Sequence, residues 1–296
     1  MTRGVKTDAA FIGGPGVGKT CLADMLYRAA AVHAAGNELL QIHPLFTAED
    51  LEPFRKFRFK VTADPKTLMR LRDIGSYLEV GEFPPPTPVD TLDLLTLNIV
   101  TPGFFGTRKS IGIYEVSGES ITDILDFIRK HDLPEVNQKI MEDQILGALF
   151  NSKVFIFLID STACIPLPDD PGERMEVQRR KYETDMETAQ IISMIAEYKM
   201  RVGGKIRAIA ALLTKHDMVG YRLPLSNGRE YKEALKSLSS TISTLEFIAN
   251  EFGIDNIAFF KSGLKVEMIN GSVKPAIPLR FYLPECLKLI KWLMEI

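Results

Sequence analysis

The sequence predicts an α/β fold in which helices cover both faces of a doubly wound, mostly parallel sheet of about six strands. Two observations support this prediction. Short apolar segments alternate with longer amphipathic ones over most of the 296 residues. A glycine-rich turn also separates the first apolar segment from the first amphipathic one. We expect a single domain over residues 1–296, with a mostly helical insertion at about 36–90.

Composition limits the classes of protein to which the chain can belong. A hydrophobic content of 46% and a charged content of 25% are typical of a globular protein, and a net charge of −2 does not favour nucleic-acid binding. Three scattered cysteines show no zinc-site spacing and suit a reducing compartment. No apolar run approaches ~18 residues. We therefore expect a cytoplasmic protein that reaches a membrane only peripherally, through a partner.

The glycine-rich turn matches the phosphate-loop pattern G-x-x-x-x-G-K-[ST]. It follows a predicted strand at 8–12 and opens a predicted helix at 20–35. Its glycines allow backbone N–H groups to surround phosphates, Lys19 can reach the β- and γ-phosphates, and the Thr20 hydroxyl can ligate Mg²⁺. The predicted nucleotide contacts here are Gly13, Gly14, Pro15, Gly16, Val17, Gly18, Lys19, Thr20 and Cys21.

The remaining elements follow from apolar periodicity. The segments 92–100 and 110–116 are predicted to pair as an antiparallel hairpin. Further strands are predicted at 153–160, 205–213 and 257–260. Helices are predicted at 119–131, 135–150, 173–201, 229–253 and 284–294, and the charged helix 173–201 is interpreted as solvated.

Two loops near the carboxyl ends of late strands predict base recognition. Thr214-Lys215-His216-Asp217 matches the [NT]-K-x-D element of GTPases, in which the Asp carboxylate accepts hydrogen bonds from N1–H and N2–H₂ of guanine. The Lys215 stem is expected to pack over the base, and Thr214 to tie the loop to the phosphate loop. Ser262, Gly263 and Leu264 are similar to the S-A-[KL] loop, whose backbone N–H meets guanine O6.

These elements, in this order across residues 11–264, resemble the Ras-like family of P-loop GTPases. The proline-rich segment before Thr87 and the long insertion also look like the prokaryotic double-GTPase (DO-GTPase) proteins. The resemblance implies a P-loop NTPase fold, GTP and GDP as ligands, Mg²⁺ as cofactor, and a GTP-hydrolysing molecular switch. It also implies an effector or a GTPase-activating protein as partner, which the sequence does not identify.

In the switch regions the sequence departs from the family pattern. Thr87, with Thr91 second, is the predicted threonine ligand of Mg²⁺. The family's D-x-x-G element corresponds to Glu115-Val116-Ser117-Gly118, so Glu115 would hold Mg²⁺ and the Gly118 N–H would bind the γ-phosphate. Glu119 occupies the place of the water-orienting glutamine, where a carboxylate has unfavourable charge, so slow hydrolysis is expected. The predicted catalytic set is Lys19, Thr87, Gly118 and Glu119.

Two alternatives remain open from the sequence. The strand 153–160 also fits a Walker B strand of an ATPase or kinase, with Asp160 on Mg²⁺. Glu115 and Glu119 are also compatible with a catalytically weak, nucleotide-dependent scaffold.

Overall fold

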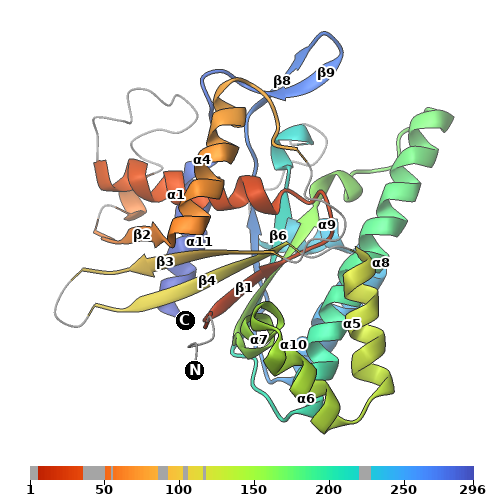
Figure 1. Cartoon of the computed structure of the whole chain (residues 1–296). Coiled ribbons are helices and arrows are strands. Elements are labelled where there is room, and N and C mark those ends of the chain that lie inside the picture. Colours follow the sequence, from red (N-terminus) through yellow and green to blue (C-terminus); the bar gives the residue numbers. More distant parts are fainter. Residues whose placement is uncertain are drawn as a thin grey trace.

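The computed structural model describes residues 6–35, 51–54, 56–85, 93–102, 106–115, 118–219 and 228–296. Its central sheet has seven strands in the order β2-β3-β4-β1-β5-β6-β7 (Figure 1). The neighbours from β4 to β7 pair in parallel, and β2, β3 and β4 pair antiparallel. The strands are β1 (Ala9–Ile12), β2 (Lys60–Ala63), β3 (Asp93–Val100), β4 (Arg108–Glu115), β5 (Val154–Asp160), β6 (Ala208–Thr214) and β7 (Ala258–Lys261).

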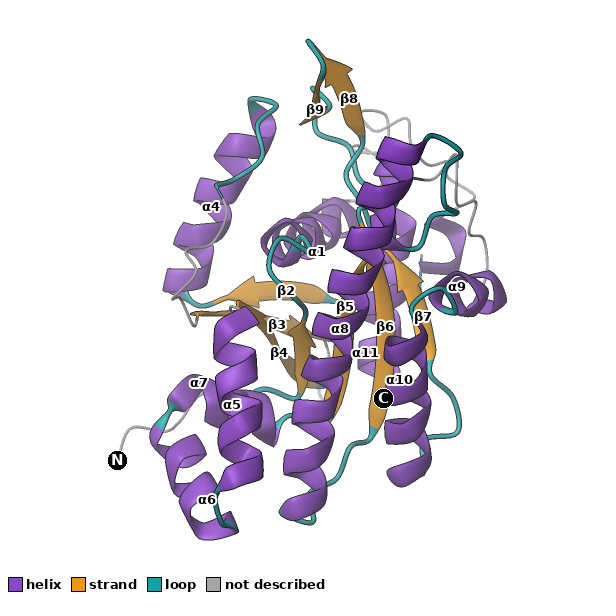
Figure 2. Ribbon diagram, turned by 90° about the vertical axis from the view of Figure 1, so that its right-hand side faces the viewer, coloured by secondary structure: helices purple, strands orange, loops and turns teal. Residues whose placement is uncertain are grey.

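Helices cover both faces of this sheet, as predicted (Figure 2). Helices α1, α4 and α11 pack on one face, and α5 to α10 pack on the other. The arrangement is consistent with a P-loop GTPase fold. The helices are α1 (Lys19–Ala35), α4 (Pro65–Glu79), α5 (Gly118–Lys130), α6 (Leu133–Glu142), α7 (Gln144–Asn151), α8 (Pro171–Arg201), α9 (Gly228–Leu235), α10 (Ser239–Glu251) and α11 (Leu283–Glu295).

The central strands are apolar on both faces because each face supports its own core. In β5, Phe155 and Phe157 pack into the core on the α8 side. Ile156 and Leu158 pack into the core on the α1 side. Successive side chains of a strand point to opposite faces, so only a continuous apolar run can fill both cores. None of the helices in the described part of the chain is long and apolar enough to span a membrane.

Two predicted helices are each divided in two. The segment 135–150 forms α6 and α7, separated at Asp143. Asp143 Oδ1 accepts hydrogen bonds from the backbone N–H groups of Ile145 (2.8 Å) and Leu146 (3.0 Å), which begins a new helix. The segment 229–253 likewise forms α9 and α10. Apolar periodicity continues across both breaks, so periodicity alone did not reveal them.

The start of α10 is held by a side chain from a different helix. The Asp185 carboxylate, on α8, accepts hydrogen bonds from the backbone N–H groups of Ser240 (3.0 Å) and Thr241 (2.7 Å). Thr241 also donates its hydroxyl to the Asp185 carbonyl at 3.2 Å. The negative charge lies at the positive end of the α10 dipole, so it joins α8 to α10.

The insertion at 36–90 is not wholly helical in its described part. It supplies β2, which pairs antiparallel with β3 at the sheet edge, and so adds a strand to the predicted set. Its helix α4 is tethered to α1 through Arg28, which contacts Asp24 (2.7 Å) on its own helix and Glu79 (2.9 Å) on α4. The alternating pattern of β2 is only four residues long, too short to distinguish from a loop by sequence.

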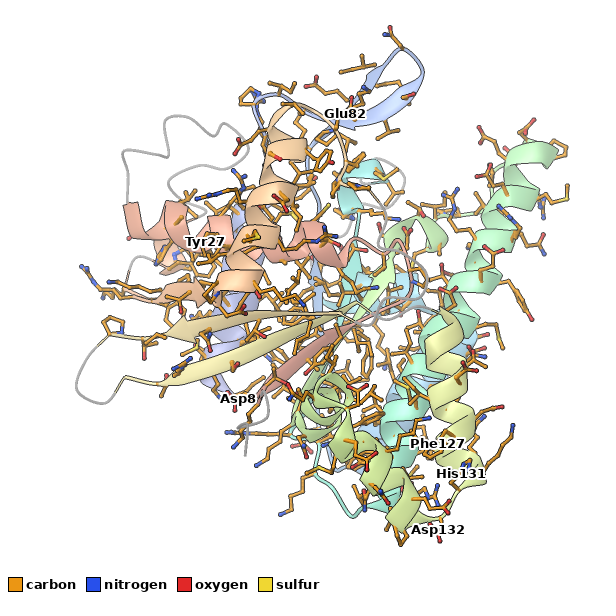
Figure 3. The ribbon with its side chains drawn as sticks, viewed as in Figure 1. Asp8, Tyr27, Glu82, Phe127, His131 and Asp132 are labelled. Atoms are coloured by element: carbon orange, nitrogen blue, oxygen red, sulfur yellow. The ribbon has the colours of Figure 1, made fainter. Side chains whose placement is uncertain are left out.

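A second small sheet was not predicted. Strands β8 (Val266–Ile269) and β9 (Ser272–Pro275) form a hairpin around Asn270 and Gly271, which both have positive φ. Asn-Gly is the preferred pair for such a turn. Figure 3 shows Glu82 close to this hairpin, where it pairs with Lys274 at 2.5 Å.

Replacing Asp185 by alanine should lower the free energy of unfolding by about 1–2 kcal/mol, because two N–H groups of α10 lose their acceptor. Urea denaturation measures this change. Asp170→Ala, which removes the cap of α8 itself, is the matched control for a purely local effect. An unchanged midpoint for Asp185→Ala would show that the contact between the two helices does not contribute.

Candidate nucleotide-binding site

The phosphate loop lies between the carboxyl end of β1 and the first turn of α1. Gly16 and Gly18 have φ of 66° and 90°, a region that side-chain-bearing residues rarely adopt. No heavy atom lies within 4 Å of a Cβ placed on either glycine. The loop therefore exposes its backbone to open space, as a phosphate cradle requires.

At position 13, glycine is required by close packing and not by a positive φ. A Cβ at this position would lie 2.7 Å from the Leu158 carbonyl oxygen and 2.9 Å from the Leu158 Cβ. These atoms belong to the neighbouring strand β5, so the loop can pack on β5 only through glycine. Val17, buried with 5% exposure, anchors the other end of the loop in the core on the α1 side.

Lys19 is folded back under the loop. Its side chain is buried, and its Nζ donates to the carbonyl oxygens of Gly13 (2.8 Å) and Gly14 (2.7 Å). The ammonium group thus lies at the positive N-terminal end of α1. This combination of a cation and a helix N-terminus favours a bound anion.

Thr20 and Cys21 complete the first turn of α1. The Thr20 hydroxyl belongs to the oxygen class that Mg²⁺ prefers. Burial, with the nearby charge of Asp24, raises the Cys21 pKa to about 12, so its thiol is neutral and serves packing. Within the described ranges, no group of three or more His, Cys, Asp or Glu residues could hold a metal ion.

The predicted switch residues are only partly described. Phe11 of β1 pairs with Ile113 of β4, so the carboxyl end of β4 lies beside the phosphate loop. Glu115 ends β4 and Gly118 begins α5 at this end. The side chains of Glu115 and Glu119 lie outside the described part of the structure, as do Thr87 and Thr91 altogether. Their assigned roles stay predictions.

The loop after β6 makes two side-chain contacts with β5, of which that of Thr214 differs from expectation. Thr214 donates its hydroxyl to the Ile159 carbonyl on β5 at 3.2 Å, whereas we expected a tie to the phosphate loop. Lys215 has a φ of 54° and its Nζ bonds Asp160 Oδ2 at 2.5 Å. Both contacts run to β5 because β5 and β6 end side by side, with Asp160 opposite Thr214.

Asp217 has one carboxylate oxygen that is not satisfied within the protein. Its Oδ1 is buried and has no hydrogen-bond partner. Burial raises the Asp217 pKa to about 7, although the backbone N–H of Leu264 lowers it. A Cβ at Gly263 would overlap Asp217 Oδ1, so only glycine allows the two loops to approach. A buried carboxylate with an unpaired oxygen is arranged to accept a donor from a ligand.

The loop after β7 is joined directly to the Asp217 loop. The backbone N–H of His216 donates to the Ser262 carbonyl at 3.1 Å, and the Ser262 N–H donates to the Leu213 carbonyl at 2.8 Å. Ser262 is buried, and its Oγ lacks a hydrogen-bond partner. The structure therefore brings the predicted residues 214–217 and 262–264 together as two directly joined loops.

Asp160 is fully engaged within the protein. Its Oδ1 accepts from the Thr162 N–H (2.9 Å) and hydroxyl (2.7 Å), and its Oδ2 accepts from Lys215. As predicted for the GTPase interpretation, it caps the end of its strand.

Sequence reasoning missed Glu187. The helix 173–201 is confirmed as α8, but its second half is buried, including Ile191 and Ile195, and is not a solvated surface. Glu187 Oε2 lies against the backbone of Gly14 in the phosphate loop. Burial and the charge of Glu183 raise the Glu187 pKa, while the charge of Lys19 lowers it. Nothing in the acidic pattern of 183–187 distinguishes this carboxylate from that of the exposed Glu183.

Comparisons with known proteins yield distant likenesses. No protein-family model and no curated protein sequence matches the chain. The chain is similar to the signal recognition particle receptor SRb-GTP/SRX complex from Chaetomium thermophilum, at 14% identity and a TM-score of 0.36, over 88% of this chain and 90% of that one. It is also similar to the GTP-bound S. cerevisiae Ski7 GTPase-like domain, at 12% identity and a TM-score of 0.36, over 88% of this chain and 43% of that one. Because both TM-scores are low, we draw no conclusion about function from them.

Asp217→Asn should stabilise the nucleotide-free protein above pH 7 by about 1–3 kcal/mol. The raised pKa favours the folded state below about pH 4, and that contribution is lost as the pH rises to about 7, because the unfolded carboxyl ionises first. Urea denaturation at pH 5 and pH 8 measures the difference, with the exposed Asp123→Asn as control. Equal pH dependence in wild type and Asp217→Asn would contradict the assigned burial.

Proposed function

We propose that the chain binds guanine nucleotides and hydrolyses GTP to GDP as a Mg²⁺-dependent molecular switch. The observation that carries this proposal is the buried, unpartnered Oδ1 of Asp217. Guanine presents N1–H and N2–H₂ as adjacent donors, and a carboxylate accepts both. Adenine lacks this donor pair and would leave the carboxylate unpaired, which gives the site a physical basis for discrimination.

The phosphate loop and the Asp217 loop are near each other. The charges of Lys215 and Asp217 both act on the pKa of Cys21, the third residue of α1. The Asp217 loop therefore lies near the helix that begins at the phosphate loop. This supports a nucleotide whose phosphates lie in the loop and whose base lies between residues 214–217 and 262–264.

The ATPase or kinase alternative receives less support. An Asp160 that ligates Mg²⁺ directly would have to break its hydrogen bonds with Thr162 or its ion pair with Lys215. That alternative also leaves the buried Oδ1 of Asp217 without a partner. The scaffold alternative differs only in catalysis, so hydrolysis measurements decide between it and the enzyme.

The finer features of the proposal rest on the sequence pattern. Thr20, Thr87 and Glu115 would supply oxygen ligands to Mg²⁺, and Gly118 would contact the γ-phosphate. Kinship with double-GTPase proteins, a cytoplasmic location and an effector or activating partner belong to the same proposal. When bound, Mg²⁺ would neutralise charge on the phosphates.

The wild-type protein should bind GDP at least ~100-fold more tightly than ADP, the scale expected for an unpaired buried polar group. Fluorescence titration with labelled nucleotides measures both affinities. Asp217→Asn should shift preference towards xanthine nucleotides, because the amide offers a donor to the second carbonyl of xanthine. The exposed Asp123→Asn should keep the guanine preference, and equal wild-type affinities for GDP and ADP would rule out the proposal.

Intrinsic hydrolysis should be slow in the isolated protein, since an arginine supplied by a partner contributes ~10³–10⁵-fold in related chemistry. Glu119→Gln should preserve or raise the single-turnover rate, because it removes a negative charge near the transferred phosphate. Phosphate release from bound GTP is the measurement. Loss of hydrolysis in Glu119→Gln with unchanged GTP affinity would instead identify Glu119 as a working base, and undetectable wild-type hydrolysis would favour the scaffold.

A further inference from the structure

Helix α8 places one carboxylate against the phosphate loop. Glu187 Oε2 is so close to Gly14 that a Cβ at this glycine would overlap it. The Gly14 carbonyl in turn accepts a hydrogen bond of 2.7 Å from Lys19 Nζ. An acidic and a basic group from distant parts of the sequence therefore flank the same residue of the loop.

Glu187 is held in this position by the packing of α8. Two residues before it, Asp185 is bonded to the first turn of α10 at 2.7 and 3.0 Å. The next residue, Thr188, is buried, and Ile191 one turn later is in the core. α8 runs along the face of the sheet opposite α1 (Figure 2). This packing fixes the part of the α8 backbone that carries Glu187 beside the loop.

Glu187 acts against the positive charge of Lys19, and triphosphate binding depends on this charge more than diphosphate binding does. In a phosphate loop the backbone N–H groups surround the α- and β-phosphates, and the lysine reaches the β- and γ-phosphates. A diphosphate depends mainly on the backbone cradle. A γ-phosphate would add negative charge next to Lys19, whose charge already acts on Glu187. Two like charges at short range in a partly buried site repel.

We propose that Glu187 sets the preference between nucleoside di- and triphosphate by competing with the γ-phosphate for the field of Lys19, so that the resting protein favours the diphosphate. The proposal rests on the nucleotide-binding function given above, and it does not depend on which base is bound. Glu187 is thus a specificity-determining residue for the phosphate chain.

The test compares affinities for GDP and for a non-hydrolysable GTP analogue in excess Mg²⁺. Glu187→Gln, which keeps the shape but removes the charge, should raise the ratio of triphosphate to diphosphate affinity about tenfold, equivalent to 1.4 kcal/mol. Glu176→Gln is the matched control, because Glu176 lies on the same helix in an exposed pair with Arg180. That control should leave the ratio unchanged. Thermal unfolding without nucleotide confirms that both variants are folded.

The outcomes separate this inference from the proposed function. A ratio that is unchanged or lowered in Glu187→Gln overturns the inference, even if guanine selectivity is confirmed. If the wild type prefers adenine nucleotides, the guanine proposal fails, and the same ratio is measured with ADP and a non-hydrolysable ATP analogue. If it binds neither class, both proposals fail. Should Glu187→Gln fold poorly, Glu187→Asp, which withdraws the charge by one methylene, should shift the ratio in the same direction by less.

Discussion

The parallel pairing of β1 with β4 and β5 is the constraint on which the rest of the site depends. Parallel strands direct their carboxyl ends to the same edge of a sheet. The loops that follow β1, β5, β6 and β7 therefore converge, although their residues are spread from Gly13 to Leu264. Burial on both faces makes this register difficult to change, since a slip of one residue would exchange the two cores.

Because these loops converge, several polar groups lie in unfavourable surroundings. Lys19 is buried with a positive charge, and Asp217 and Ser262 each have a buried oxygen without a partner. In a core, such groups would be expected to destabilise the fold. At the edge of the sheet the rest of the framework supports them, and the oxygens of Asp217 and Ser262 keep their capacity to form hydrogen bonds. Their unfavourable state in the free protein is what a bound nucleotide would relieve.

Two connections extend the site into the periphery. Arg28 links α1, which starts at the phosphate loop, to α4 of the insertion through Asp24 and Glu79. Asp185 links α8, which carries Glu187, to α10. Each connection joins an element at the phosphate loop to a helix outside it. A movement of α1 or α8 would therefore also shift α4 or α10, which lie outside the site.

The sequence by itself determined the α/β class, the phosphate loop and its flanking strand and helix, and the hairpin of β3 and β4. These features depend on local residue spacing and apolar periodicity, which can be recognised in the sequence. The sequence also located Asp217, because its loop follows a buried strand. It did not reveal the breaks at Asp143 and before α10, where side-chain caps override a continuous apolar pattern.

Only the tertiary structure decided which distant groups meet. It showed that β2 joins the sheet edge, that Lys215 pairs with Asp160, and that Asp217 keeps an unpaired oxygen next to Gly263. It also placed Glu187 against Gly14, across more than half the length of the chain. These contacts depend on how helices pack on the two faces of the sheet and on how α8 lies along one of them. No local pattern encodes such distances, because the same charged residue is solvated or buried according to the elements that fold against it.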